Sequence, residues 1–230
     1  MTNLIAAALT FLLIHLLVSG TPLRRTIVDA VGEGSFMGLF SLASLGSLIW
    51  LGVAFGVARG GPGDSVYWSS NMLTRTVQLF LQFIAIMFMV PGILTRNPTT
   101  VGQAAASGDE DVIQGMLRIT RHPFLSGVVI WASGHLLVRG DAASLVFFGT
   151  FLALGLLGPI SIDAKRARSL GPEWNGFANR TSRVPFAAIA SGRQSLNIGE
   201  IGIWRLGAGL IVFLFLLGAH PHVFGANALP

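Results

Sequence analysis

The sequence predicts an all-α, polytopic transmembrane helix bundle of about six spans with short interfacial helices. Three observations lead to this prediction: 52% of the 230 residues are hydrophobic, only 11% are charged, and the mean hydropathy is +0.69. Soluble domains carry roughly 25% charged residues, and here long uncharged stretches separate the charged blocks. This composition excludes a disordered chain and a disulfide-stapled domain, and the absence of cysteine excludes thiol chemistry.

A transmembrane helix needs about 20 mainly apolar residues. Within a single domain covering residues 1–230, six stretches approach this length: Leu4–Ser19, Phe36–Ala58, Met72–Leu94, Phe124–Val138, Ala143–Ile162 and Ile201–Ala219. The first and fifth are near the lower limit, and the fourth is shorter. The first has no basic residues before it, and Arg24 and Arg25 follow it. We therefore expect a retained helix and not a signal peptide.

The distribution of positive charge predicts the orientation. Twelve basic residues belong to the first, third and fifth loops with their helix ends: Arg24, Arg25, Arg96, Arg118, Arg121, Lys165, Arg166, Arg168, Arg180, Arg183, Arg193 and Arg205. The other side has three, Arg59, Arg75 and Arg139. By the positive-inside rule, we expect a multi-pass protein of the bacterial inner membrane with both termini periplasmic. This sorting also explains the net charge of +5, so we expect the lipid bilayer as partner and no nucleic acid.

Two cytoplasmic loops contain local helix signals. Ser107 and Glu110 fit a capping box, and the apolar residues after them predict an interfacial helix that leads into the fourth span. Pro172 suits the first turn of another helix, on which Trp174 and Phe177 point the same way. The stretch Pro185–Ala190 is apolar but too short to span, so we expect it to dip into the headgroup layer.

Several ionisable or amide side chains lie inside the predicted spans, where such groups are costly and often functional. His15 is surrounded by aliphatic residues, and His135 follows Trp131 by one turn. Gln78 and Gln82 are four residues apart on one helical face. The glutamines either link helices by hydrogen bonds or contact a ligand, and each histidine either donates to a carbonyl or binds a metal.

Two imidazoles in an apolar, cysteine-free bundle suit a haem, whose ring needs an apolar slot and whose iron takes neutral imidazole nitrogen. Without a CxxCH motif the haem would be b-type, and the small residues Gly127 and Gly134 leave room for a flat macrocycle. His15 and His135 are the expected ligands. Their levels in the membrane differ by roughly 10–15 Å at about 1.5 Å of rise per residue, so His122 and His220 stay as alternates.

The run Arg121-His122-Pro123 predicts a half-unwound, basic corner at the cytoplasmic surface, because Pro123 disfavours helical geometry at His122. Such a corner suits an anionic headgroup, a cofactor carboxylate or a haem propionate. The alternative is a positive-inside stop signal. A second charged cluster, which begins at Asp163, follows the fifth span and would share a polar pocket with this corner if the two meet.

Several motifs resemble those of the NnrU family: Ile119-Thr120-Arg121-His122-Pro123-Phe124 with Gly127, Trp131 and His135, and Thr181-Ser182-Arg183-Val184-Pro185-Phe186-Ala187-Ala188-Ile189. The resemblance covers nearly the whole chain. It implies a multi-pass membrane protein. Bacterial members are linked with denitrification, through nitrite and nitric oxide reductases. The family also includes 15-cis-zeta-carotene isomerases, which are haem b enzymes, and their proposed haem ligands fall on His15 and His135.

A more distant resemblance involves the Arg-His-Pro corner, the span after it and Leu170-Gly171-x-Glu173-Trp174. These features are similar to membrane methyltransferases of the isoprenylcysteine carboxyl and phospholipid types, which bind S-adenosylmethionine at this corner. Three hypotheses follow. The first is a haem b-binding protein that is linked to denitrification or acts as a haem-dependent isomerase on a hydrophobic or lipid-like substrate. The others are a methyltransferase and a non-catalytic accessory factor for a respiratory reductase. Arg121, His122, Trp131, Gly127, Gln78 and Gln82 are the expected cofactor-binding residues.

Overall fold

The computed structural model describes residues 1–100 and 102–230, without the side chains of Ala105, Ser107 and Glu110. The capping box predicted for Ser107 and Glu110 therefore lies outside the described residues. The helices are α1 (Thr2–Leu12), the π-helical η1 (Leu13–Val18), α2 (Leu23–Val31), α3 (Glu33–Ala58), α4 (Met72–Ile93), α5 (Met116–Ile119), α6 (Pro123–Val138), α7 (Ala142–Leu170), α8 (Pro172–Arg180), α9 (Ala187–Ala190) and α10 (Ile203–Phe224). Short 3₁₀ turns form η2 (Ala104–Gly108), η3 (Glu110–Val112) and η4 (Ile198–Ile201), and the strands are β1 (Val66–Ser69) and β2 (Arg139–Asp141).

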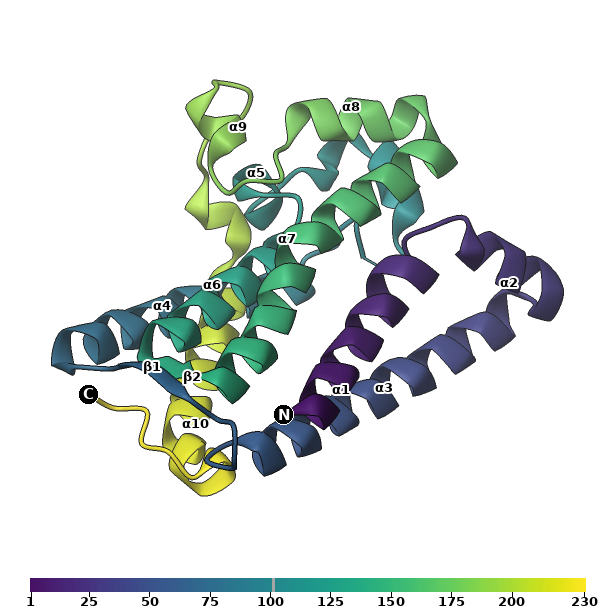
Figure 1. Cartoon of the computed structure of the whole chain (residues 1–230). Coiled ribbons are helices and arrows are strands. Elements are labelled where there is room, and N and C mark those ends of the chain that lie inside the picture. Colours follow the sequence, from purple (N-terminus) through teal and green to yellow (C-terminus); the bar gives the residue numbers. More distant parts are fainter. Residues whose placement is uncertain (101) are drawn as a thin grey trace.

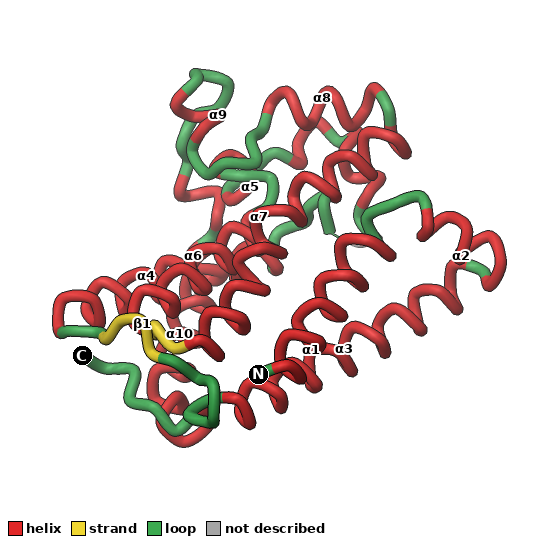
Figure 2. The backbone as a smooth tube through the Cα atoms, in the orientation of Figure 1, coloured by secondary structure: helices red, strands yellow, loops and turns green. Residues whose placement is uncertain are grey.

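The long helices contact one another in the order α3, α1, α7, α6, α4, α10 (Figure 1). Both termini lie at the end of the molecule that carries the strands (Figure 2). There β1 pairs antiparallel with β2, and the Trp68 indole nitrogen donates to the carbonyl of Leu136 at 3.2 Å. We call this the strand end. The opposite end, formed by α2, α5, α8 and α9, is the polar end.

The predicted all-α class is confirmed, and a helix lies at each of the six predicted spans. Among the described residues, α3, α4, α7 and α10 are long and apolar enough to cross a membrane. The helix Thr2–Val18 passes the same test only together with α2, from which it bends by 80°. Helix α6 has 16 residues, about 24 Å at 1.5 Å per residue, which is shorter than a bilayer core of about 30 Å. The chain is thus a multi-pass membrane protein with four or five spans by length and composition.

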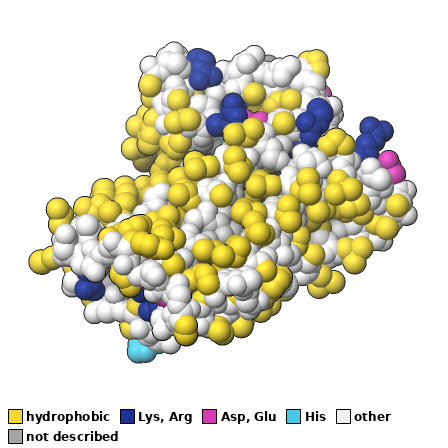
Figure 3. Space-filling model, in the orientation of Figure 1, with side chains coloured by type: hydrophobic (Ala, Val, Ile, Leu, Met, Phe, Trp, Pro, Cys, Tyr) yellow, Lys and Arg dark blue, Asp and Glu magenta, His cyan; other side chains and the backbone are white. Residues whose placement is uncertain are grey.

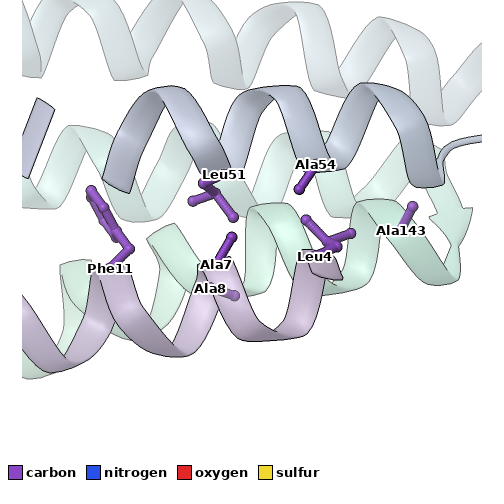
Figure 4. Packing of buried hydrophobic residues seen from close by; sticks show 7 residues of the cluster. All are labelled: Leu4, Ala7, Ala8, Phe11, Leu51, Ala54 and Ala143. Carbon is purple, nitrogen blue, oxygen red and sulfur yellow. The ribbon is translucent and has the colours of Figure 1, made fainter. Parts of the chain in front are cut away.

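The largest apolar core joins α1, α3 and α7 near the strand end. Leu4, Ala7 and Phe11 of α1 are buried against Leu51 of α3 and Ala143 of α7 (Figure 4). The alanines allow close approach of the backbones, which is the usual way in which helices associate inside lipid. Away from this core, leucine, isoleucine and valine side chains are exposed along α3, and leucine, isoleucine and phenylalanine side chains are exposed along α10. Hydrophobic side chains cover much of the face shown in Figure 3, as expected for a surface that faces lipid.

Charge is divided between the two ends. The twelve basic residues predicted for one side all belong to the polar end, while Arg59, Arg75 and Arg139 belong to the strand end with both termini. Arg75, for example, donates to the carbonyl of Leu229 near the carboxyl terminus. The predicted sorting of charge is therefore present in the fold, and the side of the membrane that each end faces stays a prediction.

The polar end is a packed cap. Trp174 and Phe177 of α8, which begins at Pro172 as predicted, are buried against Val112, Ile113 and Leu117. The prediction of one interfacial helix before the fourth span is wrong, because in the described residues this segment forms η2, η3 and the single turn α5. Its apolar side chains pack under α8, and that packing replaces the regular helical face that the sequence suggested.

The segment Pro185–Ala190 also belongs to this cap. It contains α9, and Ala188 is fully buried against the protein. Phe186 has φ +65°, in the left-handed region, and is the one non-glycine residue with positive φ among those described. Its backbone N–H donates to the carbonyl of Ile119 at 2.8 Å, and this bond fixes the turn against α5.

Candidate functional site

His15 lies on η1, one of the π-helical segments that are often found at functional sites. Its Nδ1 donates to the carbonyl oxygen of Phe11 at 2.8 Å. The ring packs 4.2 Å from the Phe11 ring and 5.7 Å from the Phe40 ring, measured between centroids. In the neutral tautomer that donates from Nδ1, the lone pair is on Nε2.

His135 on α6 repeats the same local arrangement. Its Nδ1 donates to the carbonyl oxygen of Trp131, four residues earlier, at 2.9 Å. The imidazole stacks on Phe148 of α7 with centroids 4.4 Å apart and an interplanar angle of 14°. A metal-binding histidine commonly donates its other ring N–H to a carbonyl, which fixes the tautomer and the ring orientation. Each imidazole therefore has the local chemistry of a ligand.

Aromatic rings connect the two histidines. Phe11 contacts Phe151 at 5.5 Å, Phe151 contacts Trp131 at 5.4 Å, and Trp131 contacts His135 at 4.8 Å, all between centroids. We call the set His15, Phe11, Phe151, Trp131, Phe148 and His135 the aromatic layer. It runs through α1, α7 and α6, with α7 between the two helices that carry the histidines.

His15 and His135 do not converge on one point. Among the described residues the two imidazoles share no ring neighbour: His15 packs against Phe11 and Phe40, whereas His135 packs against Trp131 and Phe148. The rings of Phe11, Phe151 and Trp131 occupy the space between them. The pair of haem ligands expected from the sequence therefore stays a prediction.

The two glycines expected to leave room for a macrocycle face α4. A Cβ at Gly127 would lie 2.5 Å from Cγ of Met89 and 2.7 Å from the carbonyl oxygen of Ala85. A Cβ at Gly134 would meet the amide nitrogen of Gln82. Both glycines therefore permit close packing of α4 on α6, and protein atoms fill the space beside them.

The glutamines lie in the same interface. Gln82 donates its amide to the carbonyl of Trp131 at 3.2 Å and so links α4 to α6. The Cγ atom of Gln78 lies 3.7 Å from the position of a Gly134 Cβ. Gln82 has the geometry of an inter-helix link, which is the first of the two roles considered for it.

The alternate histidines lie at opposite ends. His220 donates Nδ1 to the carbonyl of Ala226 at 2.7 Å near the strand end, within electrostatic range of His135. His122 lies at the polar end, immediately before α6. Among the described residues no group of three or more histidine, aspartate or glutamate side chains could hold a metal ion.

The Arg-His-Pro corner and Asp163 form a buried ionic cluster. Arg121 donates Nη2 to Oδ2 of Asp163 at 2.8 Å and Nη1 to the carbonyl of Ala178 at 3.1 Å. His122 donates Nε2 to Oδ1 of Asp163 at 2.8 Å. The Arg183 Nε lies 3.4 Å from Oδ2 of the same carboxylate. The corner and the charged cluster after the fifth span thus meet, and the carboxylate of Asp163 pairs with the corner's own side chains.

Burial lowers the pKa of His122 below its ordinary value, and this effect outweighs the raising effect of Asp163. Its side chain is 1% exposed. Neutral His122 then has its proton on Nε2, and its buried Nδ1 has no hydrogen-bond partner among the described residues. Since the guanidinium of Arg121 is occupied by Asp163 and Ala178, the corner has the geometry of a structural clamp and not of an open anion site.

Sequence reasoning missed the phenylalanines of the aromatic layer. Phe148 and Phe151 lie three residues apart on α7 and follow Phe147, and this spacing on a predicted span was a usable signal. A hydropathy profile does not reveal this spacing, because phenylalanine has a value similar to those of other apolar residues.

Fold and site together define a multi-pass helical membrane protein with two imidazoles in an apolar aromatic layer. The NnrU family model, described as NnrU protein, matches residues 3–228. The chain belongs to the NnrU family, as its motifs predicted.

Two curated relatives share this family resemblance. The chloroplastic 15-cis-zeta-carotene isomerase of Arabidopsis thaliana is 28% identical over 206 residues, which is 82% of this chain and 50% of the relative. That of Zea mays is 30% identical over 176 residues, 76% of this chain and 47% of the relative. The chain thus spans about half the length of these relatives. No solved structure matches significantly.

Proposed function

We propose that this chain holds an elongated apolar substrate along the aromatic layer and isomerises a double bond in it, with haem b as cofactor. The similarity to 15-cis-zeta-carotene isomerases supports the reaction class. The observation that carries the proposal is the aromatic layer, in which two imidazoles and four aromatic rings from three helices form one continuous set. Such a lining suits a flat conjugated chain, because aromatic faces stack on π-systems.

His135 is the ligand that we propose for haem b. Its Nδ1 is committed to the Trp131 carbonyl, which leaves Nε2 for iron. His15 has the same donor chemistry but packs against other rings, Phe11 and Phe40, so we assign it to the substrate end of the layer. Bound haem would supply a redox-active iron beside the layer. The protein's own contribution is to position the apolar chain and to exclude water.

The first test is a pyridine haemochrome spectrum of protein purified in mild detergent from haem-replete cells. We expect a b-type spectrum whose intensity His135→Ala lowers at least tenfold, whereas His15→Ala and the exposed control His222→Ala retain it. Absence of a Soret band in the unmodified protein would contradict haem binding. Loss of haem in His15→Ala with retention in His135→Ala would reverse the ligand assignment.

The second test measures the reaction itself. Proteoliposomes containing the chain are supplied with a linear cis-polyene, and the cis and trans isomers are separated by chromatography. We expect conversion that falls when Phe151 is replaced by leucine, which removes a ring of the layer and keeps its apolar character. If the protein binds haem but leaves the polyene unchanged, the proposed isomerase activity is contradicted and the proposed haem binding still stands.

The same preparation tests the two other roles predicted from the sequence. A methyltransferase would bind S-adenosylmethionine, which calorimetry detects directly. An accessory factor in denitrification would co-purify with a subunit of a nitrite or nitric oxide reductase. Turnover by the isolated chain would argue against a purely accessory role.

A further inference from the structure

Three cations gather where the corner between η1 and α2 meets the last turns of α7. Gly20 packs against the hydroxyl of Ser161 so closely that no Cβ would fit. Lys165 follows Ser161 by one turn, and Arg24 lies within electrostatic range of both Lys165 and Arg166. We call Arg24, Lys165 and Arg166 the cation cluster.

Much of this positive charge is uncompensated. Lys165 is half-buried and makes no hydrogen bond or ion pair with any residue that the structure describes. The Nε of Arg166 is buried and has no acceptor among the described residues, although its Nη2 donates to the carbonyl of Thr100 at 2.8 Å. Glu33 faces the cluster but is already paired with Arg24. Buried donors without partners are costly and usually mark a missing acceptor.

An apolar pocket of about 170 Å³ lies beside Arg24 of the cluster, between η1, α2 and α3. Val18, Ile27, Phe36 and Phe40 are among the residues that line it. The guanidinium of Arg24 lies 5.1 Å from the centre of the Phe36 ring. A cation therefore stands beside an apolar pocket, at the level where the helices pass from their apolar to their charged segments.

We propose that this corner binds an anionic phospholipid, with its phosphate on the cation cluster and part of one acyl chain in the pocket. Charge complementarity identifies the headgroup, because unpaired lysine and arginine at a membrane surface attract anionic lipid. The adjoining pocket distinguishes a lipid from free phosphate, which would use only the charged part. The site is independent of the proposed haem and isomerase activity, since it requires neither His135 nor a polyene.

The test uses the delipidated full chain in a neutral detergent. Phosphatidylglycerol, phosphatidylcholine with the same acyl chains, and inorganic phosphate are added separately, and native mass spectrometry and the unfolding temperature measure binding. We expect phosphatidylglycerol to bind and to raise the unfolding temperature, whereas the other two do not. Lys165→Gln should weaken its apparent affinity roughly fivefold, for about 1 kcal/mol per cationic side chain near the surface, and Lys165→Arg should restore it.

Arg25→Gln is the matched control, because Arg25 follows Arg24 on α2 but its side chain is 87% exposed. This variant should bind the lipid as well as the unmodified chain. Ala43→Phe narrows the exposed wall of the pocket and should reduce binding of long-chain lipid more than of short-chain lipid. Equal protection by inorganic phosphate, equal binding of phosphatidylcholine, or unchanged affinity in Lys165→Gln would overturn the proposal.

Discussion

Arg118 and Glu200 join two turns of the polar end by a bidentate ion pair. Arg118 donates Nε to Oε2 at 2.7 Å and Nη2 to Oε1 at 3.0 Å, and the Gly115 N–H donates to Oε2 at 2.9 Å. The hydrogen bond from Arg118 lowers the pKa of Glu200 below its ordinary value, and the same bond raises the pKa of Arg118. The ion pair fixes α5 to η4 and so connects the loop before α6 with the start of α10.

The Glu200 ion pair should make stability depend on pH in the acid range. Because the folded pKa of Glu200 is lowered from 4.5, its contribution is full above pH 4.5 and is lost as the pH falls through the folded pKa. We expect Glu200→Gln to lower the free energy of unfolding at pH 7 by about 1 kcal/mol. This difference should shrink towards pH 3. Tryptophan fluorescence during thermal unfolding in detergent measures it.

Glu173→Gln is the control for that experiment. Glu173 is exposed on α8 and has no ion pair among the described residues. Its replacement should change stability little at either pH. A Glu200→Gln deficit that is the same at pH 7 and pH 3 would show that the lost contribution does not come from the charge.

Single residues could be predicted where their chemistry is unusual for their position. His15 and His135 are candidates because imidazoles are rare in apolar spans, and the charged cluster that begins at Asp163 was expected near the Arg-His-Pro corner. The left-handed backbone of Phe186 could not be predicted, because nothing in an apolar run indicates positive φ at a non-glycine residue. The hydrogen bond that the Phe186 N–H donates to the Ile119 carbonyl joins residues 67 positions apart.

At the scale of elements, α6 depends on its neighbours. It is too short to span a bilayer of ordinary thickness, and it lies between α4 and α7. Gly127 admits α4 on one side, while a Cβ at Gly155 of α7 would lie 2.7 Å from Val129 on the other. Hydropathy predicted the start of α6 within one residue. It could not predict the neighbouring helices, because small residues indicate close packing but do not show which helix packs against them.

Close packing of α4 on α6 at Gly127 should make this position intolerant of a larger side chain. Gly127→Ala places a methyl group 2.5 Å from Met89 and 2.7 Å from the backbone oxygen of Ala85, and a backbone atom cannot yield as a side chain does. We expect the free energy of unfolding to fall by roughly 1–3 kcal/mol. The unfolding temperature in detergent should fall accordingly, by several degrees.

Gly149→Ala is the matched control, because no atom lies within 4 Å of its Cβ position on α7. Alanine favours a helix over glycine by about 1 kcal/mol, so this variant should be as stable as the unmodified chain or more so. If Gly127→Ala were also neutral or stabilising, α4 and α6 would not be in the close contact that links Gln82 to Trp131.

For the whole molecule, the fold class and the two-ended distribution of charge were predictable, because both follow from hydropathy and from the cost of burying charge in lipid. The ends of the helices were less predictable. The fifth span was placed at Ala143–Ile162, but α7 continues to Leu170 and carries Asp163, Lys165 and Arg166. A span prediction stops at the first charges, whereas a helix continues into the interface as long as its backbone hydrogen bonds are made.

The two ends of the molecule should face opposite sides of the membrane, with the strand end outside. The chain has no cysteine, so single-cysteine variants report their own accessibility. Ser70, which follows β1 at the strand end, and Ser195, which follows α9 at the polar end, are both exposed. In intact bacterial cells a membrane-impermeant maleimide should label Ser70→Cys, and it should label Ser195→Cys only after permeabilisation. Labelling of both variants in intact cells would contradict a membrane between the two ends. Labelling of Ser195→Cys alone in intact cells would agree with the fold but show the opposite orientation. The arginines at the polar end would then bind anionic groups on the outer surface and would not anchor the chain from inside.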